Sequence, residues 1–562
     1  MKLKKLMALL LTGAMAGSLL AGCGGNPESE ATGNDAAVAD DGGSAGSGSA
    51  ENDGDAAGGD DAANSSDAAG SDAAGDGSAS GEMTEITVVL RTLGTVDESA
   101  SEAVEEAVNE ITQSQIQVAV DLMWVDSAKY ETQVPMMIAG SEKMDLMMYT
   151  PNPSTTYNTM MAQNQLMDIT DYISEYGPEI QNTLGDDLLA ATSKDGRIYG
   201  VGNYGPLTFK AMVLIRRDLA DAAGVTELLE NATTWSEVEE GVKAISEQSG
   251  LGMVNADVNG SVLMANPALC PGDNFSDGYV YDNLGDSANL FMANKDTGKV
   301  ECMYFNEDVK EVLRRTYDWY QEGLVYKDAA MSQDFGATLL KNGVGCGLMT
   351  TTEVGGEQTS IATTGYDMIV LNPVDESASM ITTGNLTKFG FCVPVTALEP
   401  EAAIKFLNLL YTADSGLGDL LSWGIEGRDY VINEDGLAEY PEGVTAETVP
   451  YHIADFLYGN RLNITPWAGN EPNVREIQAQ ANEAAEVSPY LGFNVDNTGL
   501  EATLTSCINV FEKYKTTVLS GSTTQDFDTY YQEFLDELTA NGIDELVAAY
   551  QAQLDEWVAN NQ

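Results

Sequence analysis

Three apolar segments separated by two helical patterns constrain the fold of this 562-residue chain most strongly. The apolar segments are expected to form buried strands at residues 86–92, 116–124 and 144–150. The first helix between them is expected to begin at a capping box formed by Ser99 to Glu102. The second helix is expected to span residues 128–141. The order strand, helix, strand, helix, strand predicts an α/β fold with a parallel sheet.

The carboxyl ends of these strands form a candidate binding edge. Ligands of open α/β sheets lie beyond the carboxyl ends of the parallel strands. Thr92, Trp124 and residues 149–152 stand at these ends. Thr92 and Asn152 are therefore candidate ligand-binding residues.

The N-terminus has the features of an export signal that ends in a lipidated cysteine. Lysines at positions 2, 4 and 5 precede an apolar run over residues 6–20, and Leu20-Ala21-Gly22-Cys23 follows. A positive start, an apolar centre and small residues before a cleavage site are typical of a secretory signal, and the cysteine resembles the bacterial lipobox. We expect a signal peptide over 1–22 and a lipid on Cys23. The alternative is an ordinary signal peptide in which Cys23 is incidental.

A spacer is expected to follow Cys23. From Gly24 to about Glu82 the chain is almost wholly Gly, Ser, Ala, Asp, Asn and Glu, without an aromatic residue. Such a segment cannot bury enough apolar surface to offset the entropy lost on ordering. Residues 23–83 are therefore expected to be a lipidated cysteine and a disordered acidic linker. No other segment is long and apolar enough to span a bilayer, so the expected location is the outer face of a cell membrane, held by lipid alone, in a Gram-positive-type bacterium.

The composition excludes several classes of function. The formal net charge of −62 argues against a nucleic-acid partner, because phosphate binding depends on clustered Lys and Arg. Besides Cys23 the cysteines are Cys270, Cys302, Cys346, Cys392 and Cys507, whose spacing suits neither a zinc site nor a dense disulfide framework. His452 is the only histidine, so a histidine-dependent hydrolase would rest on that residue alone. No metal or other cofactor is expected.

Four phrases in the middle of the chain carry a family resemblance. They are QLMDITDYI (165–173), DGRIYG (195–200), AMVLIRRDLADAAGV (211–225) and TTWSEVEEGVKAI (233–245). In this order they resemble the family 1 extracellular solute-binding proteins, the maltodextrin-binding type that serve ABC importers. Later phrases extend the similarity: GVGCGLMTT (343–351), KFGFCVPV (388–395), WGIEGRDY (423–430) and PYLGF (489–493), the last two resembling a Gram-positive lipoprotein subgroup.

The resemblance implies a fold and a division into lobes. It implies the periplasmic-binding-protein-like type II fold, with two α/β lobes, a central ligand cleft and hinge crossings. The N-lobe is expected at 84–205 plus 385–412, and the C-lobe at 206–384 plus 413–562. The crossings are expected near 201–209, 383–391 and 412–420.

Sugar sites combine flat aromatic rings with polar hydrogen-bonding groups, and loop residues of both kinds are candidates. The aromatic candidates are Tyr204, Trp423 and Trp467, and the polar candidates are Asn152, Glu426 and Arg428, in addition to Thr92. Each aromatic residue could instead fill the lobe interface, and Arg428 could pair with a surface acid. Trp235, Trp319 and Trp557 have helical spacing, so we expect them to pack in cores.

The expected function is capture of a carbohydrate, in particular an oligosaccharide, and its delivery to ABC permease subunits. No covalent chemistry is implied, so we expect a binding protein and not an enzyme, acting as a monomer. Two alternatives remain open: a binding protein for a peptide or another small polar solute, and a surface glycosidase with two acidic residues, for which no carboxylate pair stands out.

Overall fold

The computed structural model describes residues 83–254, 272–275, 281–286, 290–332, 336–373 and 380–561. The expected signal peptide, Cys23, the spacer and Cys270 lie outside these residues. Within the described ranges, no helix is long and apolar enough to cross a membrane.

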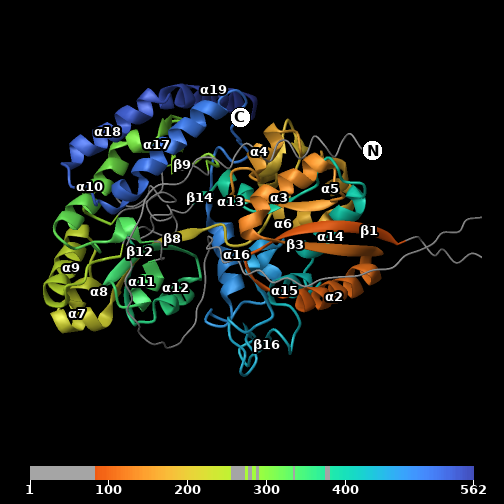
Figure 1. Ribbon diagram of the computed structural model, residues 1–562, viewed down its shortest axis with the longest axis horizontal. Coiled ribbons are helices and arrows are strands. Elements are labelled where there is room, and N and C mark those ends of the chain that lie inside the picture. Colours follow the sequence, from red (N-terminus) through yellow and green to blue (C-terminus); the bar gives the residue numbers. More distant parts are fainter. Residues whose placement is uncertain are drawn as a thin grey trace, which may run out of the picture. The chain divides into compact units, whose positions relative to one another are not determined.

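The first lobe is built on a five-stranded sheet (Figure 1). Its strands, in spatial order, are β3 (Val118–Asp126), β1 (Thr84–Thr92), β4 (Leu146–Tyr149), β15 (Gly390–Cys392) and β7 (Val201–Gly202). β1 pairs in parallel with β3 and with β4, whereas β15 runs antiparallel to β4 and to β7. The predicted parallel order of the first three strands is confirmed.

Helices cover both sides of these strands. α2 (Glu98–Ile116) lies on one side of β1 and β3, and α3 (Ser127–Gly140) lies on the other (Figure 1). The capping box expected at Ser99 to Glu102 is wrong, because Asp97 has the extended backbone of an N-cap and the helix already begins at Glu98. Asp126 caps α3, its carboxylate accepting a hydrogen bond from the amide of Ala128 at 3.0 Å.

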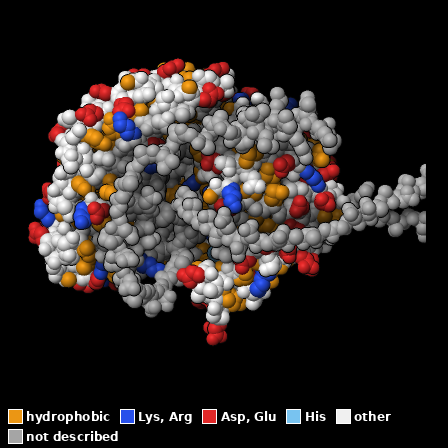
Figure 2. Space-filling view, in the orientation of Figure 1, with side chains coloured by type: hydrophobic (Ala, Val, Ile, Leu, Met, Phe, Trp, Pro, Cys, Tyr) orange, Lys and Arg blue, Asp and Glu red, His pale blue; other side chains and the backbone are white. Residues whose placement is uncertain are grey.

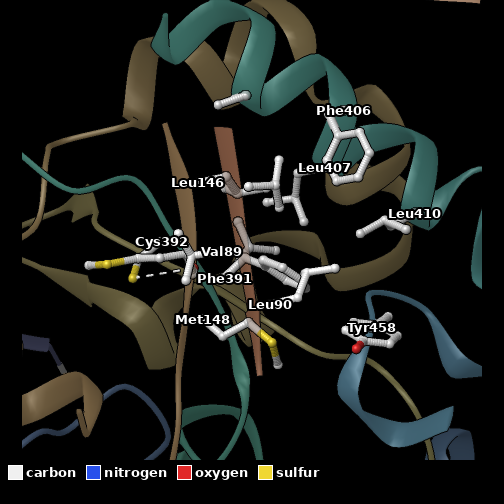
Figure 3. Packing of buried hydrophobic residues seen from close by; sticks show 14 of the residues in the cluster. Val89, Leu90, Leu146, Met148, Phe391, Cys392, Phe406, Leu407, Leu410 and Tyr458 are labelled. Atoms are coloured by element: carbon white, nitrogen blue, oxygen red, sulfur yellow. Dashed lines mark hydrogen bonds between the residues drawn. The ribbon is translucent and has the colours of Figure 1, made fainter. Parts of the chain in front are cut away.

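The core of the first lobe forms between β1 and α14 (Pro400–Tyr411). Figure 3 shows Leu407 and Leu410 of α14 directed toward Val89 and Leu90 of the strand. Cys392 lies in the same core, where its thiol contacts the carbonyl oxygen of Met147 at 3.7 Å. All four described cysteines, Cys302, Cys346, Cys392 and Cys507, are free thiols and buried.

The second lobe contains an antiparallel sheet in the order β12 (Gly347–Glu353), β8 (Phe209–Arg216), β13 (Met368–Leu371). β8 is buried on both faces, with Val213 and Ile215 in one core and Met212 and Leu214 in another. Beside it, α9 (Trp235–Ser249) begins at a capping box formed by Thr234 and Glu237.

Tryptophans support the second lobe as predicted. Trp235 is 2% exposed and Trp319, on α10 (Glu307–Gln321), is 1% exposed. A further core joins three C-terminal helices to a small sheet and includes the partly buried Trp557. The helices are α17 (Glu501–Ser520), α18 (Phe527–Ala540) and α19 (Ile543–Asn561), and the strands are β9 (Tyr281–Asp282), β10 (Phe291–Asn294) and β11 (Val300–Cys302).

The structure places two segments after residue 413, residues 417–421 and 451–458, in the first lobe and not in the second. α15 (Leu417–Trp423) contributes Leu417 and Leu421 to the first core, and β18 (Tyr451–Ile453) pairs antiparallel with β2 (Gly94–Val96). The expected boundary at residue 413 therefore fails, because this apolar segment completes the cover of the first sheet.

Two of the three expected crossings also shift. Residues 203–208 join β7 of the first sheet to β8 of the second, as predicted. However, Ile381 already belongs to the first core, so 383–391 lies within the first lobe. The expected crossing at 412–420 is wrong as well, since both Tyr411 and Leu417 lie in that core.

The buried carboxylate of Asp145 provides a test of the first lobe. It accepts hydrogen bonds from three backbone amides, those of Thr87 at 3.0 Å, Leu398 at 2.9 Å and Glu399 at 3.0 Å. Replacing Asp145 with alanine should lower the free energy of unfolding by about 2–4 kcal/mol, because these donors lose a charged acceptor. Urea unfolding measures the loss.

A matched control is Asp187→Ala, which removes an exposed carboxylate from α6 (Pro178–Leu189). We expect this change to alter stability by less than about 0.5 kcal/mol. Equal effects of the two substitutions would contradict a special role for Asp145.

Candidate ligand-binding site

Thr92 ends β1 at the carboxyl edge of the first sheet, as the sequence predicted. Its hydroxyl donates to the carbonyl oxygen of Val125 at 3.3 Å, and its own carbonyl accepts a hydrogen bond from the Ser127 hydroxyl. Thr92 is 9% exposed. These bonds fasten the ends of β1 and β3 together, and a ligand contact by Thr92 stays a prediction.

Asn152 lies in the turn after β4, at the same edge. Its carbonyl oxygen accepts from the amide of Thr155 at 2.9 Å, and its amide approaches the Thr150 hydroxyl at 3.4 Å. Within the described ranges, no hydrogen bond engages the carboxamide of Asn152, which is half-buried. Two donors and an acceptor are thus held in place by the backbone of the turn.

Tyr204 lies on the first crossing, where the backbone is held from both sides. Its amide donates to the carbonyl oxygen of Gly459 at 2.9 Å, and its carbonyl accepts from the amide of Arg461 at 2.7 Å. The neighbouring Asn203 carboxamide donates to the carbonyl of Leu457 at 2.7 Å. The Tyr204 ring is half-buried, and its hydroxyl has no hydrogen-bond partner among the described residues.

A chain of ion pairs continues from this crossing. Arg461 donates to both carboxylate oxygens of Glu353, at 2.6 Å each, and its Nε lies 2.9 Å from Asp455. Arg475 binds the other oxygen of Asp455 at 2.7 Å. Burial would raise the pKa of Asp455, but the two guanidinium groups outweigh it and lower that pKa to about 2. Since Glu353 ends β12, the chain of charges links the 455–475 segment to the second sheet.

Four aromatic side chains gather beside β18 and form what we term the aromatic cluster: Trp423, Tyr440, His452 and Trp467. The Trp467 ring is central, since its centroid lies 4.8 Å from Trp423, 4.8 Å from Tyr440 and 4.6 Å from His452. Two predicted residues, Trp423 and Trp467, are thus brought together from segments far apart in the sequence.

The two tryptophans of the cluster differ in exposure. Trp423 is 3% exposed, and its indole nitrogen donates to the carbonyl oxygen of Thr465 at 3.0 Å. Trp467 is partly exposed and stands in a loop. Trp467 is therefore better placed to stack on a ligand, with Trp423 as its support.

His452 is neutral near pH 7 in this setting. It is the middle residue of β18 and paired with Thr95 of β2. Burial lowers the pKa of His452 to about 4, against a weaker opposing effect from Asp455. Its Nδ1 is buried without a hydrogen-bond partner among the described residues.

Arg428 and Glu426 occupy the loop that follows Trp423. Arg428 donates to both carboxylate oxygens of its neighbour Asp429, at 2.8 and 2.6 Å, and reaches the carbonyl of Ala100 at 3.4 Å. Asp429 is fully buried and also accepts from the amide of Ile425 at 2.8 Å. Arg428 thus pairs with an acid, as in the alternative, but that acid is buried and not on the surface. Glu426 is exposed. Ligand contacts by both stay predictions.

Sequence reasoning missed several residues that surround these positions. His452 stands in a plain Tyr-His-Ile context, and no sequence motif surrounds Tyr440 or Arg461. Only the pairing of β18 with β2 and of Arg461 with Tyr204 brings them to the site. No local pattern signals such pairings between distant segments.

The lowered pKa of His452 predicts a pH dependence of stability. In the unfolded chain His452 takes up a proton at about pH 6.5, whereas in the folded protein its pKa is about 4. Between these pH values the unfolded chain binds more protons, so acid favours unfolding. The contribution is complete above pH 6.5 and is lost as the pH falls toward 4. Relative to His452→Gln, the wild-type protein should lose about 3 kcal/mol between pH 7 and pH 4.

Urea titrations of both proteins at pH 7, 5.5 and 4 measure this difference. The many carboxylates are the same in both proteins, so their contributions cancel in the difference. Because the chain has a single histidine, the remaining difference is assigned to His452. Parallel stability curves for the two proteins would mean that His452 is accessible to protonation in the folded state.

Comparisons with known proteins agree with the described architecture. The family described as bacterial extracellular solute-binding protein matches residues 106–421, more than half of the chain. A domain of unknown function (DUF3502) matches residues 489–559, which contain α17, α18 and most of α19.

Individual relatives are distant in sequence but similar over most of their length. A carbohydrate ABC transporter substrate-binding protein of Streptococcus pneumoniae is 21% identical over 459 residues, which are 81% of this chain and 87% of that protein. The crystal structure of an N-glycan transport solute-binding protein of S. pneumoniae superposes with a TM-score of 0.69 at 18% identity, covering 85% of this chain and all of the other.

Two further crystal structures share this fold. The same S. pneumoniae protein in complex with Man1GlcNAc gives a TM-score of 0.63 at 17% identity, with 85% and 100% of the two chains covered. An extracellular solute-binding protein of Bifidobacterium longum subsp. infantis gives 0.61 at 15% identity, with 86% and 100% covered. The two-lobed type II fold of periplasmic binding proteins is confirmed, and the chain belongs to the bacterial extracellular solute-binding proteins.

Proposed function

We propose that this protein captures an oligosaccharide between its two lobes and delivers it to the permease subunits of an ABC importer. The observation that carries the proposal is the partly exposed ring of Trp467, held by Trp423, Tyr440 and His452. A flat aromatic ring on a rigid support suits the apolar CH face of a sugar. The relatives support it: one is a carbohydrate transporter component, and another is an N-glycan transport protein solved with Man1GlcNAc.

Polar groups without partners would supply the hydrogen bonds. The carboxamide of Asn152 and the hydroxyl of Tyr204 both lack hydrogen bonds among the described residues. Both offer donors and acceptors to sugar hydroxyl groups. They stand at the sheet edge and at the first crossing, where ligands of two-lobed α/β proteins bind.

Closure of the lobes would couple capture to transport. Ligand contacts made on both lobes at once favour the closed state, since only differential affinity shifts such an equilibrium. Residues 203–208 connect the sheets, and the Arg461–Glu353 pair links the first lobe to β12 of the second. The permease would then recognise the closed form.

The lipid on Cys23 is part of the same proposal. The acidic linker proposed for residues 24–82 would join this lipid to the folded lobes. The surface shown in Figure 2 carries many acidic side chains and only scattered basic ones. Such a surface would not dock on anionic lipids by charge, so attachment would depend on the lipid.

A solute panel tests the ligand class. Thermal unfolding is measured with neutral and acidic mono- and oligosaccharides and with short peptides. We expect stabilisation by an oligosaccharide, of about 2.7 kcal/mol at a concentration 100-fold above its Kd. Stabilisation by peptides alone would refute the sugar proposal, and turnover of a glycoside would refute a role in binding only.

Trp467→Ala sharpens this test. It should weaken the binding of the oligosaccharide that stabilises the wild-type protein at least tenfold, because the stacking of the Trp467 ring on the sugar is lost. Trp557→Ala, which removes another partly buried tryptophan, from α19, is the matched control and should leave binding unchanged.

Cys23→Ser tests the anchor. In the bacterial host, we expect the wild-type protein in the membrane fraction and the variant in the culture medium, as measured by immunoblotting of both fractions. Equal membrane retention of the two proteins would contradict attachment through Cys23.

A further inference from the structure

Arg91 differs from the other arginines of this acidic chain. All nine arginines are described, and seven form ion pairs with carboxylates: Arg197, Arg216, Arg217, Arg314, Arg428, Arg461 and Arg475. Arg315 donates to the carbonyl oxygen of Gly272 at 3.3 Å. Among the described residues, the Arg91 guanidinium has neither an ion pair nor a hydrogen bond, although acidic residues outnumber basic ones 88 to 26.

The backbone of Arg91 is fixed at the carboxyl edge of the first sheet. Arg91 is the penultimate residue of β1, and its amide approaches the sulfur of Met148 at 3.4 Å. Its carbonyl oxygen accepts from the Tyr458 hydroxyl at 3.2 Å. Since Gly459 and Arg461 hold Tyr204, Arg91 lies within a continuous set of contacts that reaches the first crossing.

Two phenylalanines accompany the guanidinium. Its central carbon lies 5.6 Å from the ring centroid of Phe389, and Phe389 lies 5.3 Å from Phe456. Both rings are only partly buried. The carbonyl of Phe389 accepts from the amide of Asn203 at 3.0 Å, which ties this pair to the crossing as well. The Arg91 guanidinium and the two phenylalanine rings therefore lie together where the ligand is proposed to bind.

A structural role alone does not explain why one donor of Arg91 is buried without an acceptor. Its Nε is buried without an acceptor, and contact with a ring at 5.6 Å satisfies no N–H group. Burial lowers the pKa of Arg91, opposed by electrostatic interactions with Tyr130, Tyr458 and Asp126. The positive charge is thus partly desolvated and lacks a paired carboxylate among the described residues.

We infer that Arg91 is a ligand-binding residue whose guanidinium donates hydrogen bonds to two neighbouring oxygen atoms of a sugar residue. Phe389 and Phe456 would contact the apolar face of that sugar residue. The inference rests on the proposed function and deepens it. A guanidinium has five donors and no acceptor in a rigid fork, so it selects paired oxygens. Vicinal hydroxyls of a neutral sugar and the carboxylate of a uronic acid both present them.

Calorimetric titration of the full chain tests the inference. The probes are maltotriose, mannotriose, cellotriose and trigalacturonate, and the variants are Arg91→Gln, Arg91→Lys and the control Arg197→Gln. Arg197 is 62% exposed by its side chain and pairs with Asp168 on the first lobe, outside the proposed site. We expect Arg91→Gln to weaken the tightest probe at least tenfold and Arg197→Gln to leave its Kd within twofold.

The remaining outcomes separate the two ligand sources. If trigalacturonate is the tightest probe, Arg91→Lys should retain part of the affinity and added salt should weaken binding. If a neutral trisaccharide is the tightest, Arg91→Lys should lose as much as Arg91→Gln, since the bidentate fork is absent. Should Arg91→Gln fail to fold, as judged by circular dichroism, Arg91→Lys carries the test.

Wild-type affinity in every Arg91 variant that folds would overturn the inference and leave the proposed function intact. Binding of peptides by the wild-type protein, with no response to any saccharide, would instead overturn both.

Discussion

Strand β1 is hydrogen-bonded along both edges and buried on both faces, and the first lobe depends on this position. Its pairing with β3 runs in unbroken register from Thr84 to Thr92. Ile86 to Leu90 are almost fully excluded from solvent, so a one-residue slip would disturb the packing on both faces of the strand at once. Because β1 cannot shift, its register fixes the positions of Arg91 and Thr92 at its carboxyl end and of β2, which follows.

The segment from Tyr451 to Arg461 connects this fixed edge with the rest of the site. Its first residues form a strand that pairs with β2, and the Tyr458 hydroxyl then donates to the carbonyl oxygen of Arg91. Gly459 and Arg461 form backbone hydrogen bonds with Tyr204. At the end of the segment, Arg461 forms an ion pair with Glu353. A carboxylate buried between two arginines supports its turn at Asp455. One continuous stretch of chain therefore touches the first sheet, the crossing and the second sheet.

Patterns that arise from neighbours in sequence were predictable. The alternation of strands and helices from residue 84 to 150 and the capping box at Thr234 depend on local periodicity and side-chain chemistry, and both are present. The order of family phrases also led to the correct family. The lobe boundary expected at residue 413 was wrong, because α15 and β18 are apolar segments that could cover either lobe.

The site divides in the same way. The ends of β1 and β4, with Thr92 and Asn152, could be placed from sequence because parallel strands share one edge. The proximity of Trp423 to Trp467 and the solitary state of Arg91 could not, since each depends on which distant segments pair. An arginine without a carboxylate partner is visible only when every neighbour is known.

The buried thiols described above have a practical consequence for observing lobe motion. Burial raises the pKa of Cys302 and of Cys346 to about 12 and that of Cys507 to about 11, and it raises that of Cys392 further. At neutral pH these thiols are therefore almost wholly protonated, so these four groups react slowly with maleimides. Fluorescent dyes attached to cysteines introduced on the surfaces of the two lobes would therefore report on distance changes with little background from these four positions.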